Sequence, residues 1–226
     1  MDADRQAGGL EFEIGRIGSG DEGGDTNLTI GAVAGDQCPC HQPATGGGDG
    51  LSGIVNGGGG TINAVVYAMP VGGNPPRSAP RSAIMDQVNK EFLPFVVPVL
   101  TGTAVTFPNK DNIRHHVYSF SPAKKFEIKL YVGTPASPVV FDQTGIAVLG
   151  CNIHDNMAAW VVIVDTPWFG RTDADGRLQL ASVPAGRYNL RAWHPGMTVG
   201  AQPVEQALQV DAAPLAASVT LAGVRP

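Results

Sequence analysis

The sequence predicts an all-β protein, and three observations carry this prediction. The chain of 226 residues contains 30 Gly and 18 Pro, well above ordinary usage, and both residue types favour turns. Only 15% of the residues are charged, against roughly 25% in an ordinary globular protein. The apolar runs are short, rich in β-branched and aromatic residues, and without a sustained period of 3.6 residues. We therefore expect many short strands joined by turns.

Residues 1–50 are expected to form a flexible leader, because they are rich in Gly and Asp and include GDEGGD and TGGGDG. One short strand is expected near LTIGAVAG. No signal peptide is visible, and no stretch approaches the roughly 20 apolar residues that span a bilayer. Cys38 and Cys40, followed by His41, have a C-x-C-H spacing that matches no standard zinc or haem pattern, so we assign them no function.

The sequence pattern changes at Leu51, where strand-like segments begin. Within residues 51–74, LSGIV and TINAVVYAMP predict two strands around a Gly-rich connection. Residues 75–166 predict a run of strands: FLPFVVPVL, TAVTFPN, HVYSF, KFEIKLYV, PVVFD, IAVLGC and AAWVVIVD. Residues 167–226 predict a second β unit with turns at ADG and PAG, in which His194 is expected to pack at a strand end.

The charge balance excludes one class of partner. The formal net charge is −5, and Lys and Arg form no cluster along the chain. Binding a phosphate backbone or an anionic membrane surface requires concentrated positive charge. We therefore expect no nucleic-acid partner.

The chemistry is predicted to lie in the segment CNIHDNM. Here Cys151, His154 and Met157 follow the spacing C-x2-H-x2-M, directly after the apolar run IAVLG and before AAWVVIV. A short loop between two strands aims all three side chains at one point. A thiolate, an imidazole and a thioether form a soft ligand set that suits copper, and two His with one Cys and a weak axial Met is an electron-transfer arrangement. Zinc is the main rival, but zinc sites rarely use Met.

A second histidine is needed, and NKDNIRHHVYSF supplies it. His115 and His116 lie at the start of a predicted strand that an antiparallel sandwich brings beside the Cys loop. Asn109 and Asp111, together with the histidine that is not the ligand, are candidates for the residues that orient the ligands and tune the site.

The segments GTAVTFPNKDNIRHHVYSF and GIAVLGCNIHDNMAAWVVIV resemble the cupredoxins. The short loop CNIHDNM resembles that of the amicyanins, and over residues 51–200 the chain is most similar to cupredoxin-domain proteins called methylamine utilization proteins. The resemblance implies a Greek-key β-sandwich. It also implies that His115 is the first histidine ligand, since one residue and then Val117 follow it. His116 then takes the place of an Asn that hydrogen-bonds across the site.

The tail GRTDADGRLQLASVPAGRYNLRAWHPG resembles carboxypeptidase regulatory-like or transthyretin-like β-sandwiches, whose opening strands would be LSGIVNGGGGTINAVVYAMP. Since those strands precede the cupredoxin-like part, we expect a cupredoxin domain, residues 75–166, inserted into a second sandwich made of residues 51–74 and 167–226. Modules of this second kind carry no catalytic residues.

Together these features predict a type 1 (blue) copper protein with one copper per chain and with His115, Cys151, His154 and Met157 as ligands. The resemblance implies a one-electron carrier, not an enzyme, in a periplasmic redox chain between a dehydrogenase and a c-type cytochrome. The alternative is a copper-binding or copper-storage module without electron transfer. An enzyme of the multicopper oxidase or nitrite reductase kind needs further histidines, and only His41 and His194 remain.

Overall fold

The computed structural model describes residues 12–13, 31–32, 51–56, 62–211, 215–221 and 224. All regular secondary structure in these residues is β, which confirms the predicted class. Cys38, Cys40 and His41 lie outside the described residues. Within the leader, only strands β1 (Phe12–Glu13) and β2 (Gly31–Ala32) are described, and they pair antiparallel.

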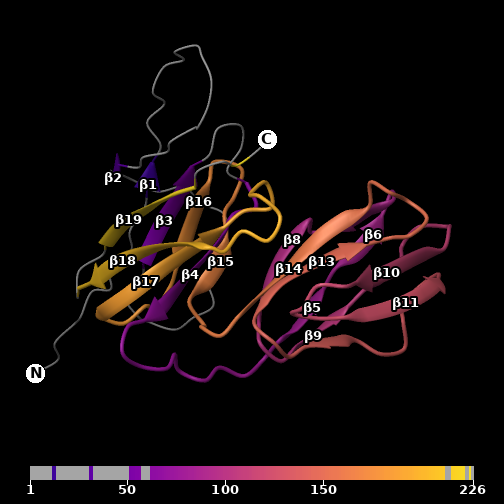
Figure 1. Ribbon diagram of the computed structural model, residues 1–226, viewed down its shortest axis with the longest axis horizontal. Helices are drawn as coiled ribbons and strands as arrows, with labels where there is room; N and C mark the ends of the chain where they lie inside the picture. Colours follow the sequence, from indigo (N-terminus) through magenta and orange to yellow (C-terminus); the bar gives the residue numbers. More distant parts are fainter. Residues whose placement is uncertain are drawn as a thin grey trace, which may run out of the picture. The chain divides into compact units, whose positions relative to one another are not determined.

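The chain divides into two compact units. One comprises Met1–Asn74 and Trp168–Pro226, and the other comprises Pro75–Pro167. Both are built from β-sheets (Figure 1). No helix in the described part of the chain is long and apolar enough to span a membrane.

The unit Pro75–Pro167 contains a five-stranded and a three-stranded sheet. The larger sheet has the order β11 (Phe126–Tyr131), β10 (His115–Ser119), β13 (Gly145–Gly150), β14 (Ala158–Val164) and β8 (Val96–Leu100). The smaller sheet has the order β12 (Val139–Phe141), β9 (Thr103–Thr106) and β5 (Ser82–Ile84). Pairing is antiparallel except between β14 and β8 and between β5 and β9.

The two sheets of this unit share one hydrophobic core. Val105 and Phe141 contribute to it from the smaller sheet, and Val117, Leu149 and Val161 contribute from the larger one. Successive side chains of a strand point to opposite faces of the sheet, and this decides which residues are buried. In β13, Ala147 and Leu149 are buried, while Val148 between them is exposed. Cys151 and Met157 belong to the same cluster, so their side chains are part of this core.

A hairpin of β6 (Asp86–Val88) and β7 (Glu91–Leu93) completes the unit. Val88 pairs with Glu91, so Asn89 and Lys90 form a two-residue turn. Their φ angles are 54° and 64°, as a type I′ hairpin turn requires at both positions. Asn tolerates this left-handed conformation, whereas for Lys it costs on the order of 1 kcal/mol.

One predicted strand is divided in the structure. The run FLPFVVPVL was expected to be a single strand, but it forms the end of β7 and the whole of β8. Pro94 lies at the break, and its lack of an N–H group removes one hydrogen bond from any continuous ladder.

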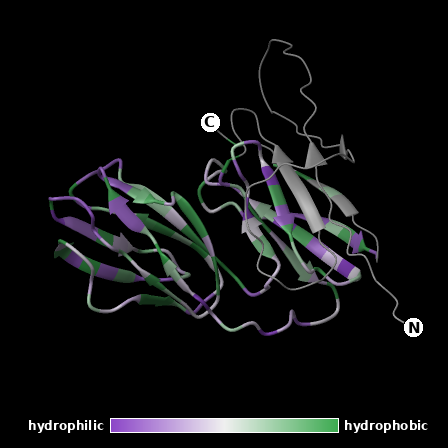
Figure 2. Ribbon diagram, turned by 180° about the vertical axis from the view of Figure 1, so that it is seen from behind, coloured by the Kyte–Doolittle hydropathy of each residue, from purple (hydrophilic) through white to green (hydrophobic). Residues whose placement is uncertain are grey.

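The other unit also contains two sheets. The four-stranded sheet has the order β15 (Phe169–Arg171), β4 (Val65–Pro70), β17 (Gly186–Trp193) and β18 (Val204–Val210). The three-stranded sheet has the order β16 (Arg177–Leu180), β3 (Leu51–Asn56) and β19 (Leu215–Thr220). A separate core joins them, with Val66, Leu190 and Val219 among its members. Hydrophobic and hydrophilic residues both occur along the strands of each unit (Figure 2).

Candidate metal centre

The loop between β13 and β14 is closed by its own backbone. The Cys151 N–H donates to the Met157 carbonyl at 3.2 Å, and the Met157 N–H donates to the His154 carbonyl at 2.9 Å. Gly150 pairs with Ala158 just outside the loop. Since the strands fix both ends, the positions of Cys151 and Met157 are set by the sheet, and His154 lies on a turn between them.

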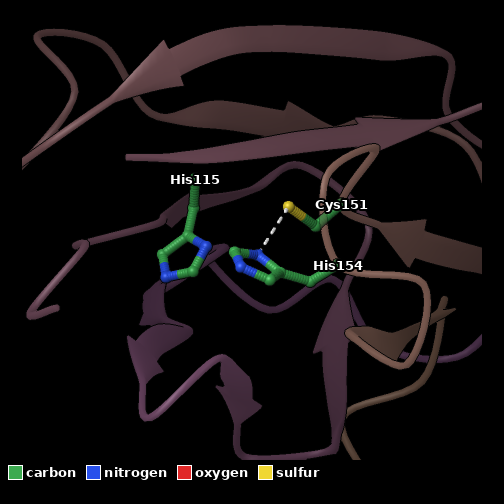
Figure 3. Close-up of side chains that lie close together, drawn as sticks. All are labelled: His115, Cys151 and His154. Atoms are coloured by element: carbon green, nitrogen blue, oxygen red, sulfur yellow. Dashed lines mark hydrogen bonds between the residues drawn. The ribbon is translucent and has the colours of Figure 1, made fainter. Parts of the chain in front are cut away.

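Three predicted residues converge. One ligand atom from each of His115, Cys151 and His154 lies within 4.8 Å of the others, and no other group of three or more His, Cys, Asp or Glu converges in this way among the described residues. The Cys151 Sγ lies 3.8 Å from the His154 Nδ1, and the rings of His115 and His154 are 4.9 Å apart (Figure 3). Met157 is buried in the same core cluster as Cys151.

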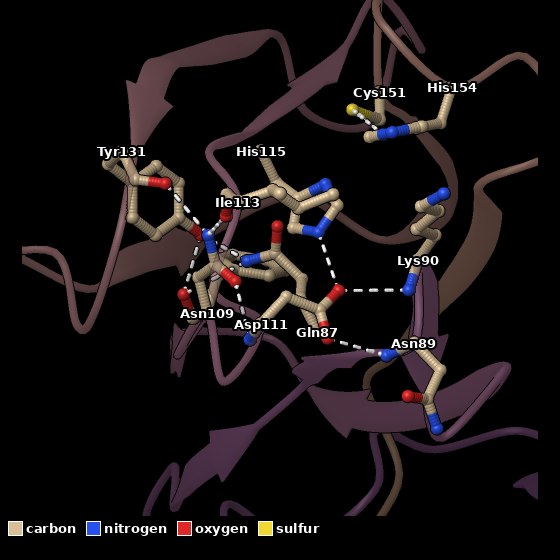
Figure 4. Close-up of polar contacts among 11 residues, drawn as sticks. Gln87, Asn89, Lys90, Asn109, Asp111, Ile113, His115, Tyr131, Cys151 and His154 are labelled. Atoms are coloured by element: carbon tan, nitrogen blue, oxygen red, sulfur yellow. Dashed lines mark hydrogen bonds and ion pairs between the residues drawn. The ribbon is translucent and has the colours of Figure 1, made fainter.

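The ring of His115 is held by a carboxylate. Its Nε2 lies 2.7 Å from Asp111 Oδ2, while its Nδ1 is buried and makes no hydrogen bond (Figure 4). Partial desolvation opposes ionisation of Asp111, but hydrogen bonds from the Lys90 N–H, His115 and the Asn89 N–H outweigh it and lower its pKa. An ionised carboxylate only accepts hydrogen bonds, so the Nε2–H of His115 donates to Asp111, and in the neutral ring this leaves the lone pair of Nδ1 free.

His116 is not part of the converging group. Its Nε2 contacts Glu127 Oε1 at 2.9 Å, and its ring lies 5.4 Å from that of Tyr118. The register between β10 and β11 shifts between His115 and Val117, and such irregularities re-aim side chains. Of the two adjacent histidines, the structure therefore brings His115 to Cys151 and leaves His116 beside β11.

Asn109 organises the loop before β10. Its Nδ2 donates to the carbonyls of Ile113 and Tyr131, each at 2.8 Å, and its Oδ1 accepts from the Asp111 N–H at 3.0 Å. The side chain is almost fully buried, so these bonds replace those that water would make. Asn109 thus hydrogen-bonds to the backbone of Asp111, and Asp111 in turn contacts His115 of the converging group.

Two residues near the site were not expected from the sequence. Gln87 is fully buried, and its Nε2 contacts the Tyr131 hydroxyl and the Phe107 carbonyl. The Tyr131 hydroxyl donates to the Phe107 carbonyl at 2.6 Å. Burial raises the pKa of Tyr131 to about 12, with the bond from Gln87 opposing the shift and the charge of Cys151 adding to it. Nothing in the local sequence distinguishes these two residues from ordinary strand residues.

The comparisons with known proteins give only similarities of fold. No family model and no curated protein matches the sequence. A pseudoazurin from Sinorhizobium matches with a TM-score of 0.31 and 19% identity, over 38% of this chain and 76% of that one.

Two further solved structures match at the same level. A copper-containing nitrite reductase from Thermus scotoductus matches with a TM-score of 0.35 and 21% sequence identity, over 42% of this chain and 25% of that one. The P94A mutant of amicyanin matches with a TM-score of 0.33 and 20% sequence identity, over 37% of this chain and 82% of that one. At these TM-scores we draw no functional conclusion from the matches.

Proposed function

We propose that this chain is a type 1 copper protein that carries one electron, with one copper per chain. His115, Cys151 and His154 are the strong ligands, and Met157 is the weak fourth ligand. The observation that carries the proposal is the convergence of His115, Cys151 and His154, with one ligand atom of each within 4.8 Å of the others, together with the buried Nδ1 of His115, which has no hydrogen-bond partner. A buried nitrogen without a partner is costly, and a metal ion supplies the missing interaction.

The donor set suits copper that changes oxidation state. A thiolate and a thioether stabilise Cu(I), and two imidazoles also accept Cu(II). His115, Cys151 and Met157 are all nearly inaccessible to solvent, and the loop that holds two of them is closed by backbone hydrogen bonds. Because the packed strands fix these ligands, they move little between the two oxidation states, which favours fast electron transfer.

The arrangement of the histidines favours a carrier over a multicopper enzyme. His194, the remaining described histidine outside the β10 and β13–β14 segments, uses both ring nitrogens: Nε2 contacts the Ile62 carbonyl at 3.0 Å and Nδ1 accepts from the Gly196 N–H at 2.9 Å. His116 has its Nε2 on Glu127. The Nδ1 of His116 is also buried without a hydrogen-bond partner, but among the described residues neither histidine converges with two further metal-ligating groups, as a second copper centre would need.

The setting of this carrier is proposed from the resemblance of the sequence alone. The carrier is proposed to work in a periplasmic redox chain of the methylamine utilization type, with a dehydrogenase and a c-type cytochrome as its partners. Residues 51–74 and 167–226 are proposed to form a carboxypeptidase regulatory-like module with a structural or binding role. The supporting features are the loop CNIHDNM for the carrier and the tail GRTDADGRLQLASVPAGRYNLRAWHPG for the module.

The first test is the visible spectrum of the purified protein loaded with Cu(II). We expect an intense thiolate-to-copper band that a mild reductant bleaches reversibly, with one copper per chain. Cys151→Ser should abolish the band because the thiolate is the charge donor. His116→Asn is the matched control, and it should keep the band. A wild-type protein that binds copper tightly without colour would instead indicate the storage module.

A further inference from the structure

We propose that the turn of the β6–β7 hairpin, Asn89 and Lys90, is a positioning element of the metal centre and acts on His115 through Asp111. The inference rests on the proposed function, in which His115 is a ligand. It concerns residues that lie more than twenty positions from His115 in the sequence and whose backbone N–H groups donate to Asp111.

One carboxylate joins the turn to the ligand. Asp111 Oδ1 accepts the Asn89 N–H at 2.7 Å, and Oδ2 accepts the Lys90 N–H at 2.9 Å (Figure 4). The same Oδ2 lies 2.7 Å from the Nε2 of His115. The oxygen that holds the ligand ring is therefore itself held by the backbone of Lys90.

The turn is fixed relative to the loop that carries Asp111. The Gln87 N–H donates to the Pro108 carbonyl at 2.8 Å, and the Lys110 N–H donates to the Gln87 carbonyl at 2.9 Å. Gln87 is fully buried, so these two bonds lie away from competing water. The hairpin and the loop thus form one hydrogen-bonded body in which both turn N–H groups face Asp111.

This arrangement sets the orientation of the His115 ring. A carboxylate held by two backbone donors fixes the direction of the Nε2–H bond, and hence the rotation of the ring and the nitrogen that stays free. In Figure 4 the other ring nitrogen of His115 lies on the side of Cys151 and His154. If the turn N–H groups are displaced, Asp111 gains freedom and the ring loses its fixed orientation.

The decisive variant is Lys90→Pro, with Lys90→Gly as its matched control. Both remove the Lys side chain. Proline also removes the N–H group and restricts φ to about −65°, whereas glycine keeps the N–H group and readily adopts the 64° found here. A Gly inserted between Asn89 and Lys90 serves as a second disrupting variant, because a longer turn displaces both donors while the strands stay paired.

In the two disrupting variants only, we expect a lower affinity for copper and a shifted Cu(II)/Cu(I) equilibrium. Mutation of a ligand's hydrogen-bond partner typically lowers metal affinity about 10- to 100-fold, and since these variants loosen Asp111 without removing it, we expect a loss near the lower end of that range. Because a less basic imidazole stabilises Cu(II) less, the Cu(II)/Cu(I) equilibrium should move about tenfold towards Cu(I), which is about 59 mV for a one-electron couple. Unchanged affinity and equilibrium in both folded disrupting variants would overturn the proposal.

A double-mutant cycle tests whether the turn acts through Asp111. In an Asp111→Ala background, Lys90→Pro should change the copper equilibrium by less than about twofold, because the connecting carboxylate is gone. An effect as large as in the wild type would mean that the turn acts by another path, and the proposal would be wrong.

A final measurement uses the metal-free protein, so its failure is distinct from failure of the proposed function. Nitrogen-15 NMR should show the proton of His115 on Nε2 in the wild type and in Lys90→Gly. In Lys90→Pro and the insertion variant, that proton should exchange faster and partly move to Nδ1. The same tautomer in all four proteins would refute the positioning role, whether or not the copper-loaded wild type is blue.

Discussion

His115 and His116 are neighbours in the chain, yet their rings have different environments. His115 is fully buried, with Asp111 on one nitrogen and the other nitrogen free. His116 contacts Glu127, a residue of the adjacent strand β11. Both histidines are buried, but only His115 lies in the group with Cys151 and His154, because neighbouring side chains along a strand point to opposite faces. Because His116 contacts Glu127 and is not in the group with Cys151 and His154, His116→Asn is a suitable control.

Gly150, one residue before Cys151, is required by a close contact. A Cβ at this position would lie 2.8 Å from Cζ and 2.9 Å from the hydroxyl oxygen of Tyr118. The centroid of the half-buried Tyr118 ring lies 5.4 Å from that of His116 and 5.1 Å from that of the exposed Phe120, so moving aside would cost the ring these contacts.

We expect Gly150→Ala to lower the free energy of unfolding of the metal-free protein by about 1–3 kcal/mol, the usual cost of overpacking. Urea denaturation measures the loss. In a Tyr118→Ala background the same change at Gly150 should cost much less, because the atoms that clash are absent. An equal cost in both backgrounds would show that the ring contact is not the cause.

At the scale of elements, the candidate site is divided between a local and a non-local part. The loop from Cys151 to Met157 brings three proposed ligands in seven residues, so its chemistry is visible in the sequence. His115 comes from β10, which meets β13 only through the pairing of Tyr118 with Gly150. Asn89 and Lys90 come from a hairpin that no sequence pattern predicted, since the predicted strand FLPFVVPVL begins only at Phe92.

The end of β17 carries a histidine whose neutral form is stabilised by folding. Burial lowers the pKa of His194, and the Ile62 carbonyl opposes the shift only in part. The Gly196 N–H donates to Nδ1, so Nε2 donates to Ile62 and the folded ring has no free site for a proton. The prediction that His194 packs at a strand end agrees with its burial after Trp193.

This arrangement predicts a pH dependence of stability. The unfolded ring binds a proton near its ordinary value of 6.5, and the folded ring does so only at lower pH. The contribution of His194 is therefore fully present above pH 6.5 and is lost as pH falls through the folded pKa. In urea titrations between about pH 7 and pH 5, the stability of the wild type should fall more steeply than that of His194→Asn. Equal slopes would contradict the prediction, since the other histidines are common to both proteins.

At the scale of the whole molecule, the two units have separate hydrophobic cores. The core with Phe141 and Leu149 lies within Pro75–Pro167, and the core with Leu190 and Val219 lies within the other unit. All residues of the candidate centre belong to the first of these units. A bound metal therefore stabilises directly only the unit that holds its ligands.

We expect calorimetry to resolve two unfolding transitions, of which only one moves when copper is added. At a free copper concentration 100 times the dissociation constant, the stabilisation is about 2.7 kcal/mol. Leu190→Ala should lower the other transition, with a cost of about 2–5 kcal/mol. A single transition that moves as a whole with copper would mean that the two units unfold together.

The sequence by itself determined the all-β class and the cluster of donors in CNIHDNM, because strand alternation, turn residues and ligand spacing are local properties. Only the tertiary structure decided that His115 and not His116 lies beside Cys151, and that Asp111 is held by Asn89 and Lys90. These outcomes depend on the register between strands and on the left-handed turn of a hairpin. The contacts involved are made between segments distant in the chain, so they depend on packing across the sandwich, which no local pattern specifies.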